Sequence, residues 1–361
     1  MAKRKRKIQK STSSKSFWVR FCLSIIIIVA TACVFYFGGG LDLFKEYAPS
    51  EEMGRFDFEV HFIDVGQGDA TLIRLPDDKT VLIDTGESEA GESLVSYVSD
   101  VFDYHKLSVI DYLILTHQDD DHIGSGVEIL NRFQVNCVYR PMQRANYEVE
   151  NFGEEYLSNY PISTTKAYSA VIEAVYNEPN CDIKFSREGE SIVGENYSFN
   201  FLTPFSVSSS TDNNNFSPII MLEYNGAKIL FTGDAESEVE REAVERYGND
   251  LKADVLKVGH HGSNTSSCQT FLDAVMPSYS IISVGQDNQY NLPSNAVVER
   301  LKSSGSQVLS TAENGTIVLT AQDGEIIFIS HHVPNTNIII IVCAGLVLLM
   351  LVWGIRVKKK S

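Results

Sequence analysis

A dense group of histidines and aspartates follows an apolar segment near the end of the first third of the chain. Residues 109–115 are apolar enough to predict a buried β-strand, and the chain continues as Thr116-His117-Gln118-Asp119-Asp120-Asp121-His122-Ile123-Gly124. Three carboxylates and two imidazoles so close together are not tolerated in a fold unless they are paired or bind a cation. The aspartates alone would indicate a solvated acidic turn. Histidines on both sides of them favour a divalent metal site.

Three more places in the chain put acids or histidines directly after a predicted strand. Asp84 ends the apolar segment 81–83, Asp234 follows 229–233, and the pair His260-His261 follows 255–259. Taken singly, each has an ordinary explanation as a turn, a helix cap or a buried polar group. Functional residues of layered α/β folds collect at strand ends, so their joint occurrence with His117–His122 indicates one site.

Alternating and apolar segments around these residues predict a mixed α/β domain. The second half repeats the strand and helix rhythm of the first, which indicates two sheets packed together with helices outside. Asn225-Gly226 predicts a hairpin turn, and residues 142–161 are polar and look irregular. The predicted strands are 56–65, 70–75, 80–83, 109–115, 135–140, 182–185, 197–202, 219–224, 228–232, 253–258, 280–284, 307–309, 316–319 and 325–329, and the predicted helices are 93–104, 126–133, 164–176, 236–247, 269–274 and 296–303.

Five motifs in this order resemble those of the metallo-β-lactamase superfamily, and more narrowly the extracytoplasmic hydrolase domain of the ComEC family of competence DNA-uptake proteins. The similarity covers residues 57–330 and implies a four-layer αββα sandwich with its metal site on loops along one edge of both sheets. The motifs are His61-Phe62-Ile63-Asp64-Val65-Gly66-Gln67-Gly68-Asp69-Ala70, Leu82-Ile83-Asp84-Thr85-Gly86, Thr116–Gly124, Phe231-Thr232-Gly233-Asp234-Ala235 and Lys257-Val258-Gly259-His260-His261-Gly262-Ser263.

The resemblance implies two divalent ions as cofactors, Zn²⁺ or Mn²⁺, because carboxylate-rich ligation is harder than an all-histidine set. His117 and Asp119 would bind the first ion, and Asp121 and His122 would bind the second. Asp234 would bridge the two ions. One residue of the histidine pair would complete the second site, and the sequence does not decide which one. The implied ligands are His117, Asp119, Asp121, His122, Asp234 and either His260 or His261.

Supporting and catalytic roles also follow from the resemblance. Asp84 would hold a ligand in its orientation, and Asp64 and Asp69 are placed in the same supporting group. A metal-bound hydroxide would carry out hydrolysis, oriented by Asp121 or Asp234. The outcome would be cleavage of an ester or phosphodiester.

Two positions depart from the family pattern. The strand end Phe201-Leu202-Thr203-Pro204 lacks the histidine that often completes the first metal site. The stretch Asn288-Gln289-Tyr290-Asn291-Leu292-Pro293 has Leu292 where ComEC-like domains tend to carry a histidine, so a proton donor is missing. The first departure favours a first metal site that is weakly occupied or keeps extra waters, and the second argues against the nuclease activity of that branch.

The charge is unevenly placed, and both ends of the chain look like membrane anchors. Eight basic residues in 1–20 precede the uncharged segment 21–37, and the apolar segment 338–355 precedes four more in 356–361. Each apolar segment is near the minimum that spans a bilayer, and the positive-inside rule places both termini in the cytoplasm. The domain 56–330 would then be extracytoplasmic. A cleaved signal ending near Ala30-Thr31-Ala32, or a lipid on Cys33, is the alternative for the first segment.

The middle of the chain is strongly acidic. It holds 18 of the 30 basic residues and all 47 acidic ones, a formal charge of −29 that repels long polyanions.

Cys137, Cys181 and Cys268 show no paired spacing, which predicts neither a disulfide framework nor a thiolate metal site.

The sequence therefore predicts a membrane-anchored, metal-dependent hydrolase with DNA or RNA as the first substrate to test. A small or cell-wall ester, phosphodiester or lactone is the second interpretation, and a metal-poor surface binding module is the third. Lys257, Ser263, Thr265 and Ser266 are either substrate contacts or part of a solvated loop.

Overall fold

The computed structural model describes residues 56–205 and 212–330, and these form two β-sheets with helices on their outer faces. The predicted basic tails 1–20 and 356–361 and the predicted membrane segments 21–37 and 338–355 lie outside the described residues. Among the helices of residues 56–205 and 212–330, none is both long and apolar enough to cross a bilayer.

The first sheet has eight strands in the order β17-β16-β1-β2-β3-β4-β5-β8. The sheet is parallel from β3 through β4 and β5 to β8, and it is antiparallel from β17 through β16, β1 and β2 to β3. Strand β3 therefore pairs parallel with β4 and antiparallel with β2. Its strands are β1 (Glu59–Phe62), β2 (Thr71–Arg74), β3 (Thr80–Ile83), β4 (Val109–Ile114), β5 (Gln134–Arg140), β8 (Asp182–Phe185), β16 (Ile317–Gln322) and β17 (Glu325–Ser330).

The second sheet has seven strands in the order β15-β14-β13-β12-β11-β10-β9, and β12 to β15 run parallel. The predicted Asn225-Gly226 hairpin joins β11 to β12, with Tyr224 opposite Ala227. Its strands are β9 (Ser191–Val193), β10 (Tyr197–Phe201), β11 (Ile220–Tyr224), β12 (Ala227–Phe231), β13 (Val255–Lys257), β14 (Tyr279–Ile282) and β15 (Gln307–Ser310).

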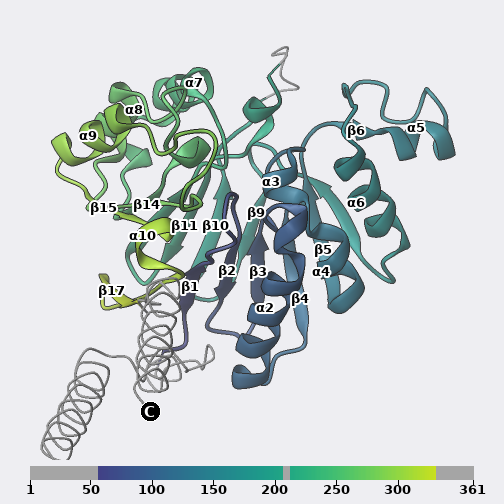
Figure 1. The fold of residues 1–361 in the computed structure, drawn as a ribbon, viewed down its shortest axis with the longest axis horizontal. Helices are drawn as coiled ribbons and strands as arrows, with labels where there is room; N and C mark the ends of the chain where they lie inside the picture. The colour runs from purple at the N-terminus through teal and green to yellow at the C-terminus, as the bar shows by residue number, and fades with distance from the viewer. Residues whose placement is uncertain (1–55, 206–211, 331–361) are drawn as a thin grey trace, which may run out of the picture. The chain divides into compact units, whose positions relative to one another are not determined.

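Helices cover the outer face of each sheet, so the predicted four-layer αββα arrangement is present (Figure 1). Helices α2, α4 and α6 lie along the first sheet, and α7, α8 and α9 pack on an apolar cluster of the second. The helices are α2 (Gly91–His105), α3 (Asp120–Ile123), α4 (Gly126–Arg132), α5 (Asn146–Phe152), α6 (Lys166–Asn177), α7 (Ser237–Tyr247), α8 (Gln269–Val275), α9 (Asn295–Ser303) and α10 (Thr311–Asn314), with short 3₁₀ turns η3 (Ser88–Ala90), η4 (Asn213–Phe216), η5 (Gly248–Leu251) and η6 (Gly259–Gly262).

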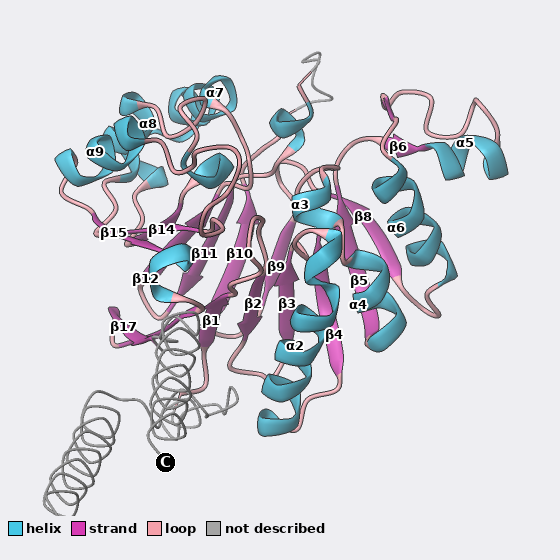
Figure 2. Ribbon diagram, in the orientation of Figure 1, coloured by secondary structure: helices cyan, strands magenta, loops and turns pink. Residues whose placement is uncertain are grey.

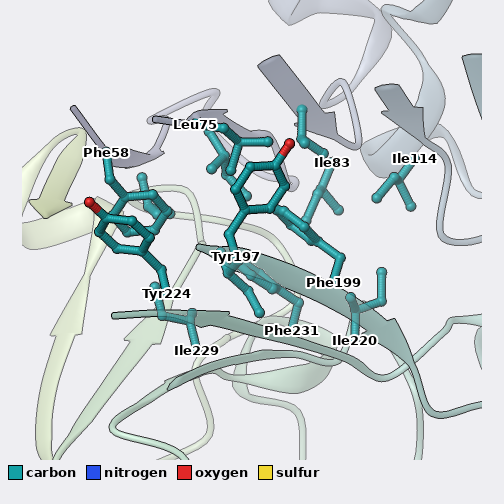
Figure 3. Close-up of a cluster of buried hydrophobic side chains, with 14 of the residues drawn as sticks. Phe58, Leu75, Ile83, Ile114, Tyr197, Phe199, Ile220, Tyr224, Ile229 and Phe231 are labelled. Carbon is teal, nitrogen blue, oxygen red and sulfur yellow. The ribbon is translucent and has the colours of Figure 1, made fainter. Parts of the chain in front are cut away.

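Apolar side chains from both sheets form the main core between them (Figure 3). Phe58 beside β1 stacks on Tyr224 of β11 with ring centroids 4.3 Å apart, and Phe199 and Phe231 are also fully or almost fully buried. Burying an aromatic side chain stabilises a fold by about 1.5–3 kcal/mol, so this layer holds the two sheets in a fixed relative position. The edges of the sheets are thereby fixed too.

The insert after β5 is more regular than its sequence indicates. Within residues 142–161 the chain forms the short strand β6 (Arg144–Ala145), which pairs with β7 (Ile162–Ser163), and the helix α5. A buried ion pair between Arg140 and Glu148, at 2.7 Å, fixes this helix from within. A polar pattern gives no periodic signal for such an element, because its stability comes from a tertiary contact.

The parallel strands of both sheets end at one edge of the molecule. The loops after β3, β4, β12 and β13 leave from this edge, where α3 also lies (Figure 2). Each of these loops carries one of the acid or histidine positions that the sequence singled out.

Candidate metal centre

A network around Asp84 shapes the loop that follows β4. Asp84 Oδ1 accepts a hydrogen bond from the backbone nitrogen of Thr116 at 2.8 Å, and Oδ2 accepts one from the Thr116 hydroxyl at 2.7 Å. The same Oδ2 lies 2.7 Å from Nδ1 of His122, which is fully buried. The contact of Nδ1 with Asp84 fixes the ring of His122 and directs Nε2 away from the network.

Nε2 of His122 meets side chains of the second sheet. It lies 3.1 Å from Asp234 Oδ1 and 3.2 Å from Nε2 of His261. Nε2 of His261 in turn lies 3.2 Å from Asp121 Oδ2. Ligands of one tetrahedral Zn²⁺ ion, with bonds of about 2 Å, are separated by about 3.3 Å, and each of these three contacts is close to that separation.

A second group of donors forms around His117. Its Nε2 lies 3.8 Å from Asp119 Oδ2 and 3.9 Å from Asp234 Oδ2. Nδ1 of His117 lies 3.1 Å from the Thr116 hydroxyl and 3.3 Å from that of Ser217, which fixes the ring. Asp234 therefore lies between the two groups: its Oδ1 faces His122, and its Oδ2 lies 3.9 Å from Nε2 of His117 and 3.8 Å from Nε2 of His261.

The two adjacent histidines face different surroundings. His261 is buried and reaches His122 and Asp121, and its Nδ1 lies 2.9 Å from the carbonyl oxygen of Ser283. His260 is about a quarter exposed and lies 2.8 Å from the Thr265 hydroxyl, with its Nε2 3.8 Å from Asp234 Oδ2. This geometry favours His261 as a donor of the group around His122 and places His260 at the rim of the group around His117.

The electrostatics of the centre favour positive charge. Burial alone would lower the pKa of His261, but the nearby carboxylates of Asp234, Asp121 and Asp69 raise it to about 10. Burial opposes the ionisation of Asp234, yet His122 and His261 hold its pKa well below the ordinary value. Carboxylates arranged in this way attract a cation, whether a proton or a metal ion.

The chemistry of the donor set fits the divalent ions that the resemblance implies. Nε2 of His117 is buried and has no hydrogen-bond partner among the described residues. Burial, followed by the charge of His122, lowers the pKa of His117 to about 3, so this imidazole is neutral and offers a free lone pair. His117, His122 and Asp234 have donor atoms within 4.8 Å of one another, as do Asp69, His122 and His261. A buried, neutral, unpartnered imidazole beside carboxylates is what a metal ligand requires.

The residues predicted to support the ligands behave differently from one another. Asp84 contacts His122 directly, and Asp69 Oδ1 lies 3.5 Å from Nδ1 of His261. Asp64 is exposed and accepts a hydrogen bond from the backbone nitrogen of Gly66, within its own turn. The structure therefore brings Asp84 and Asp69 to the ligands and leaves Asp64 outside the cluster.

Lys257 is buried at the end of a strand and is not part of a solvated loop. Its side chain is 3% exposed and its Nζ lies 2.7 Å from Asp69 Oδ2. The loop interpretation fails because Lys257 is the last residue of β13, in register with Phe231 and Ile281 of the inter-sheet core. The alternation of β13 directs its ammonium group between the sheets.

The structure also accounts for the two departures from the family pattern. Thr203 is buried, and its hydroxyl accepts a hydrogen bond from the backbone nitrogen of Ile219. Leu292 packs on the apolar cluster of the second sheet's outer face. Ser217, which sequence reasoning missed, contacts His117 and accepts from the backbone nitrogen of Asp234. An isolated serine in a Ser/Asn-rich stretch gives no signal for this role.

Comparison with known proteins supports the family resemblance. Residues 63–194 match the sequence model of the metallo-beta-lactamase superfamily. The chain is 32% identical over 272 residues to ComE operon protein 3 of Bacillus subtilis, which covers 72% of this chain and 32% of that protein. It is 31% identical over 267 residues to Recombination protein 2 of Haemophilus influenzae, covering 74% of this chain and 29% of that protein.

The chain thus spans about a third of the length of the curated relatives it matches. Among solved structures it is similar to the metallo-beta-lactamase fold protein YhfI of Bacillus subtilis, with a TM-score of 0.41 and 12% identity. That match covers 76% of this chain and 100% of YhfI.

Proposed function

This chain carries a domain of the metallo-beta-lactamase superfamily, and on that premise we propose that it is a hydrolase that cleaves phosphodiester bonds with two divalent ions. The observation that carries the proposal is the convergence of donors from both sheets on Asp234, whose two carboxylate oxygens face His122 and His117. The group of six donors is His117, Asp119, Asp121, His122, Asp234 and His261.

The chemistry would depend on the bound ions and on carboxylates beside them. Divalent ions held by this set would lower the pKa of a coordinated water to near neutrality and would neutralise charge on a phosphoryl oxygen. In this proposal Asp121, about a third exposed, or the buried Asp234 orients the attacking water. The carboxylate share of the ligands makes Mn²⁺ as suitable as Zn²⁺.

Hydrolysis of bis(4-nitrophenyl) phosphate by the purified full chain tests this function. We expect activity that disappears with a chelator, returns with Mn²⁺ or Zn²⁺, and is lost in Asp121→Ala. A chain that binds neither ion and stays inert with both would contradict the proposal. An Asp121→Ala variant as active as the parent would contradict the assignment of the site.

The surroundings of the centre favour a small substrate as a second candidate. Burial and the charges of Glu89, Asp121 and Asp120 raise the pKa of Glu87, which shows how closely acids crowd this rim. A rim of this sign repels a long polyanion and tolerates a short phosphodiester or neutral ester. We therefore propose to compare single-stranded DNA, RNA and bis(4-nitrophenyl) phosphate at two salt concentrations. Cleavage of nucleic acid at low salt would favour the first candidate, and activity on the small ester alone the second.

We also propose that residues 21–37 and 338–355 anchor the domain on the outer side of a membrane. The support is the basic flanks of both segments, which predict cytoplasmic termini. Protease added to intact cells should digest residues 56–330, and full protection of this domain would reverse the orientation.

A further inference from the structure

Lys257 and Asp69 form a buried ion pair between the two sheets, beside the candidate metal centre. Lys257 ends β13 of the second sheet, and Asp69 precedes β2 of the first. Both side chains are at most 6% exposed, and Nζ lies 2.7 Å from Asp69 Oδ2 and 3.3 Å from the carbonyl oxygen of Val258. Removing two charges from water is unfavourable unless they pair closely, so each group depends on the other.

Asp69 connects this pair to two candidate ligands. Its backbone nitrogen donates to the carbonyl oxygen of Asp121 at 3.0 Å, and its carbonyl oxygen accepts from Gly86 at 2.8 Å. Its Oδ1 lies 3.5 Å from Nδ1 of His261. One residue therefore contacts the backbone of one ligand and the imidazole of another.

The contacts that orient His261 matter because its backbone conformation is unfavourable. His261 has a φ of +49°, in the left-handed region that residues with a side chain rarely adopt. Carboxylates and carbonyl oxygens behind a ligating imidazole fix its ring and tautomer, and loss of such a contact typically lowers metal affinity 10–100-fold. The hydrogen bond of His261 Nδ1 goes to the Ser283 carbonyl oxygen at 2.9 Å, and Asp69 Oδ1 lies 3.5 Å from the same nitrogen as a close charged contact.

We propose that Lys257 is a positioning residue for the second metal site: it holds the Asp69 carboxylate in place, and Asp69 in turn orients His261 and the loop of Asp121. The inference rests on the metal centre of the proposed function. The proposal adds Lys257, a residue of the inter-sheet core, to the metal centre. The ammonium group of Lys257 contacts Asp69 and the Val258 carbonyl oxygen rather than any of the six candidate donors. The ion pair thereby joins the packing of the sheets to the geometry of the metal site.

The direction of the effect separates positioning from simple electrostatics. An ammonium group near a cation site repels the cation, so its removal alone would tighten metal binding. A positioning role predicts the opposite. We expect Lys257→Met to bind Mn²⁺ or Zn²⁺ at the site of His122 and His261 about 10–100-fold more weakly than the parent chain.

The test is titration of the metal-free full chain with Mn²⁺ and Zn²⁺ by calorimetry, with bound ions counted by elemental analysis. Lys257→Arg should restore most of the affinity because it keeps the charge. Glu148→Gln is the matched control: it breaks the buried Arg140 pair, so it should lower the unfolding midpoint and leave metal affinity unchanged. Circular dichroism confirms that each variant is folded.

A double-mutant cycle shows whether Lys257 acts through Asp69. Asp69→Asn should weaken the second site as much as Lys257→Met, and the double variant should be no weaker than either one. The double variant also removes both charges together, which folds are more tolerant of than one unpaired buried charge.

Several results would overturn the inference. Equal or tighter binding by Lys257→Met would do so, as would losses that multiply in the double variant. A parent chain that binds two ions, together with unaffected variants, removes only this inference. A parent chain that binds neither ion removes the proposed function as well.

Discussion

Nε2 of His122, in the loop after β4 of the first sheet, lies 3.1 Å from Oδ1 of Asp234, in the loop after β12 of the second. The contact exists only when the two sheets are packed, because each partner belongs to a different one. Asp234 also reaches toward His117 with its other oxygen. One carboxylate therefore links both groups of candidate ligands.

Replacing Asp234 by asparagine should disable the centre while preserving the fold. The amide has the same shape but lacks the charge that two cations would share. We expect metal affinity and the rate of phosphodiester hydrolysis to fall by more than about 100-fold. This exceeds the loss of about 10–100-fold that follows when a residue contacting a metal ligand is replaced. Elemental analysis and hydrolysis rates measure this. Retention of two ions per chain would show that Asp234 does not bridge.

Asp84→Asn should weaken metal binding although it changes no metal ligand. Asp84 holds Nδ1 of His122, and the amide cannot accept from both Thr116 and His122 as the carboxylate does. We expect a loss of about 10–100-fold in metal affinity, measured by calorimetry. Asp78→Asn is the control, since Asp78 has the same φ of +59° in an exposed turn. Equal effects of both substitutions would contradict the role of Asp84.

Gly68→Ala should displace the loop of Asp121. Gly68 has a φ of +144°, and a Cβ there would overlap the carbonyl oxygen of Asp121. We expect weaker metal binding by more than about 10-fold together with reduced stability. Gly189→Ala is the matched control, because Gly189 has a φ of +87° and nothing within 4 Å of its Cβ position. That control should lose about 1–2 kcal/mol of stability and keep its metal affinity.

Glu59 should make the stability of the domain fall in acid. Glu59 is fully buried, with Oε2 3.0 Å from His105 and 3.4 Å from His61. Burial alone would raise its pKa, but hydrogen bonds from these two histidines lower it from 4.5 to about 2. Because the folded-state pKa is the lower one, Glu59 stabilises the fold above pH 4.5 and this contribution is lost as the pH falls toward 2.

The corresponding free energy of unfolding is about 3 kcal/mol, because a pKa that differs by 1 between the folded and unfolded chain is worth about 1.4 kcal/mol. Urea unfolding of the parent and Glu59→Gln between pH 6 and pH 3 measures it. The difference between the two proteins should shrink as the pH falls. Glu150→Gln, at an exposed position, should show no such trend. A constant difference would contradict the lowered pKa of Glu59.

The regular part of the fold could be predicted from hydrophobic patterns. Strand β3 (Thr80–Ile83) and strand β8 (Asp182–Phe185) have the predicted bounds, and the hairpin at Asn225-Gly226 is where its turn residues indicate. Apolar alternation and turn chemistry are local properties, so a single sequence displays them. Helix α5 was missed because its stability depends on Glu148 reaching the buried Arg140.

By itself, the sequence determined the order of the main strands and helices and the strand ends at which candidate ligands occur, since both follow from local patterns and from the types of residue. Only the tertiary structure distinguished the surroundings of His260 and His261, because His122 and Asp121, which lie beside His261, come from the other sheet. It alone placed Lys257 in the core against Asp69. Contacts across two sheets depend on how those sheets pack, and no segment of the chain carries that information locally.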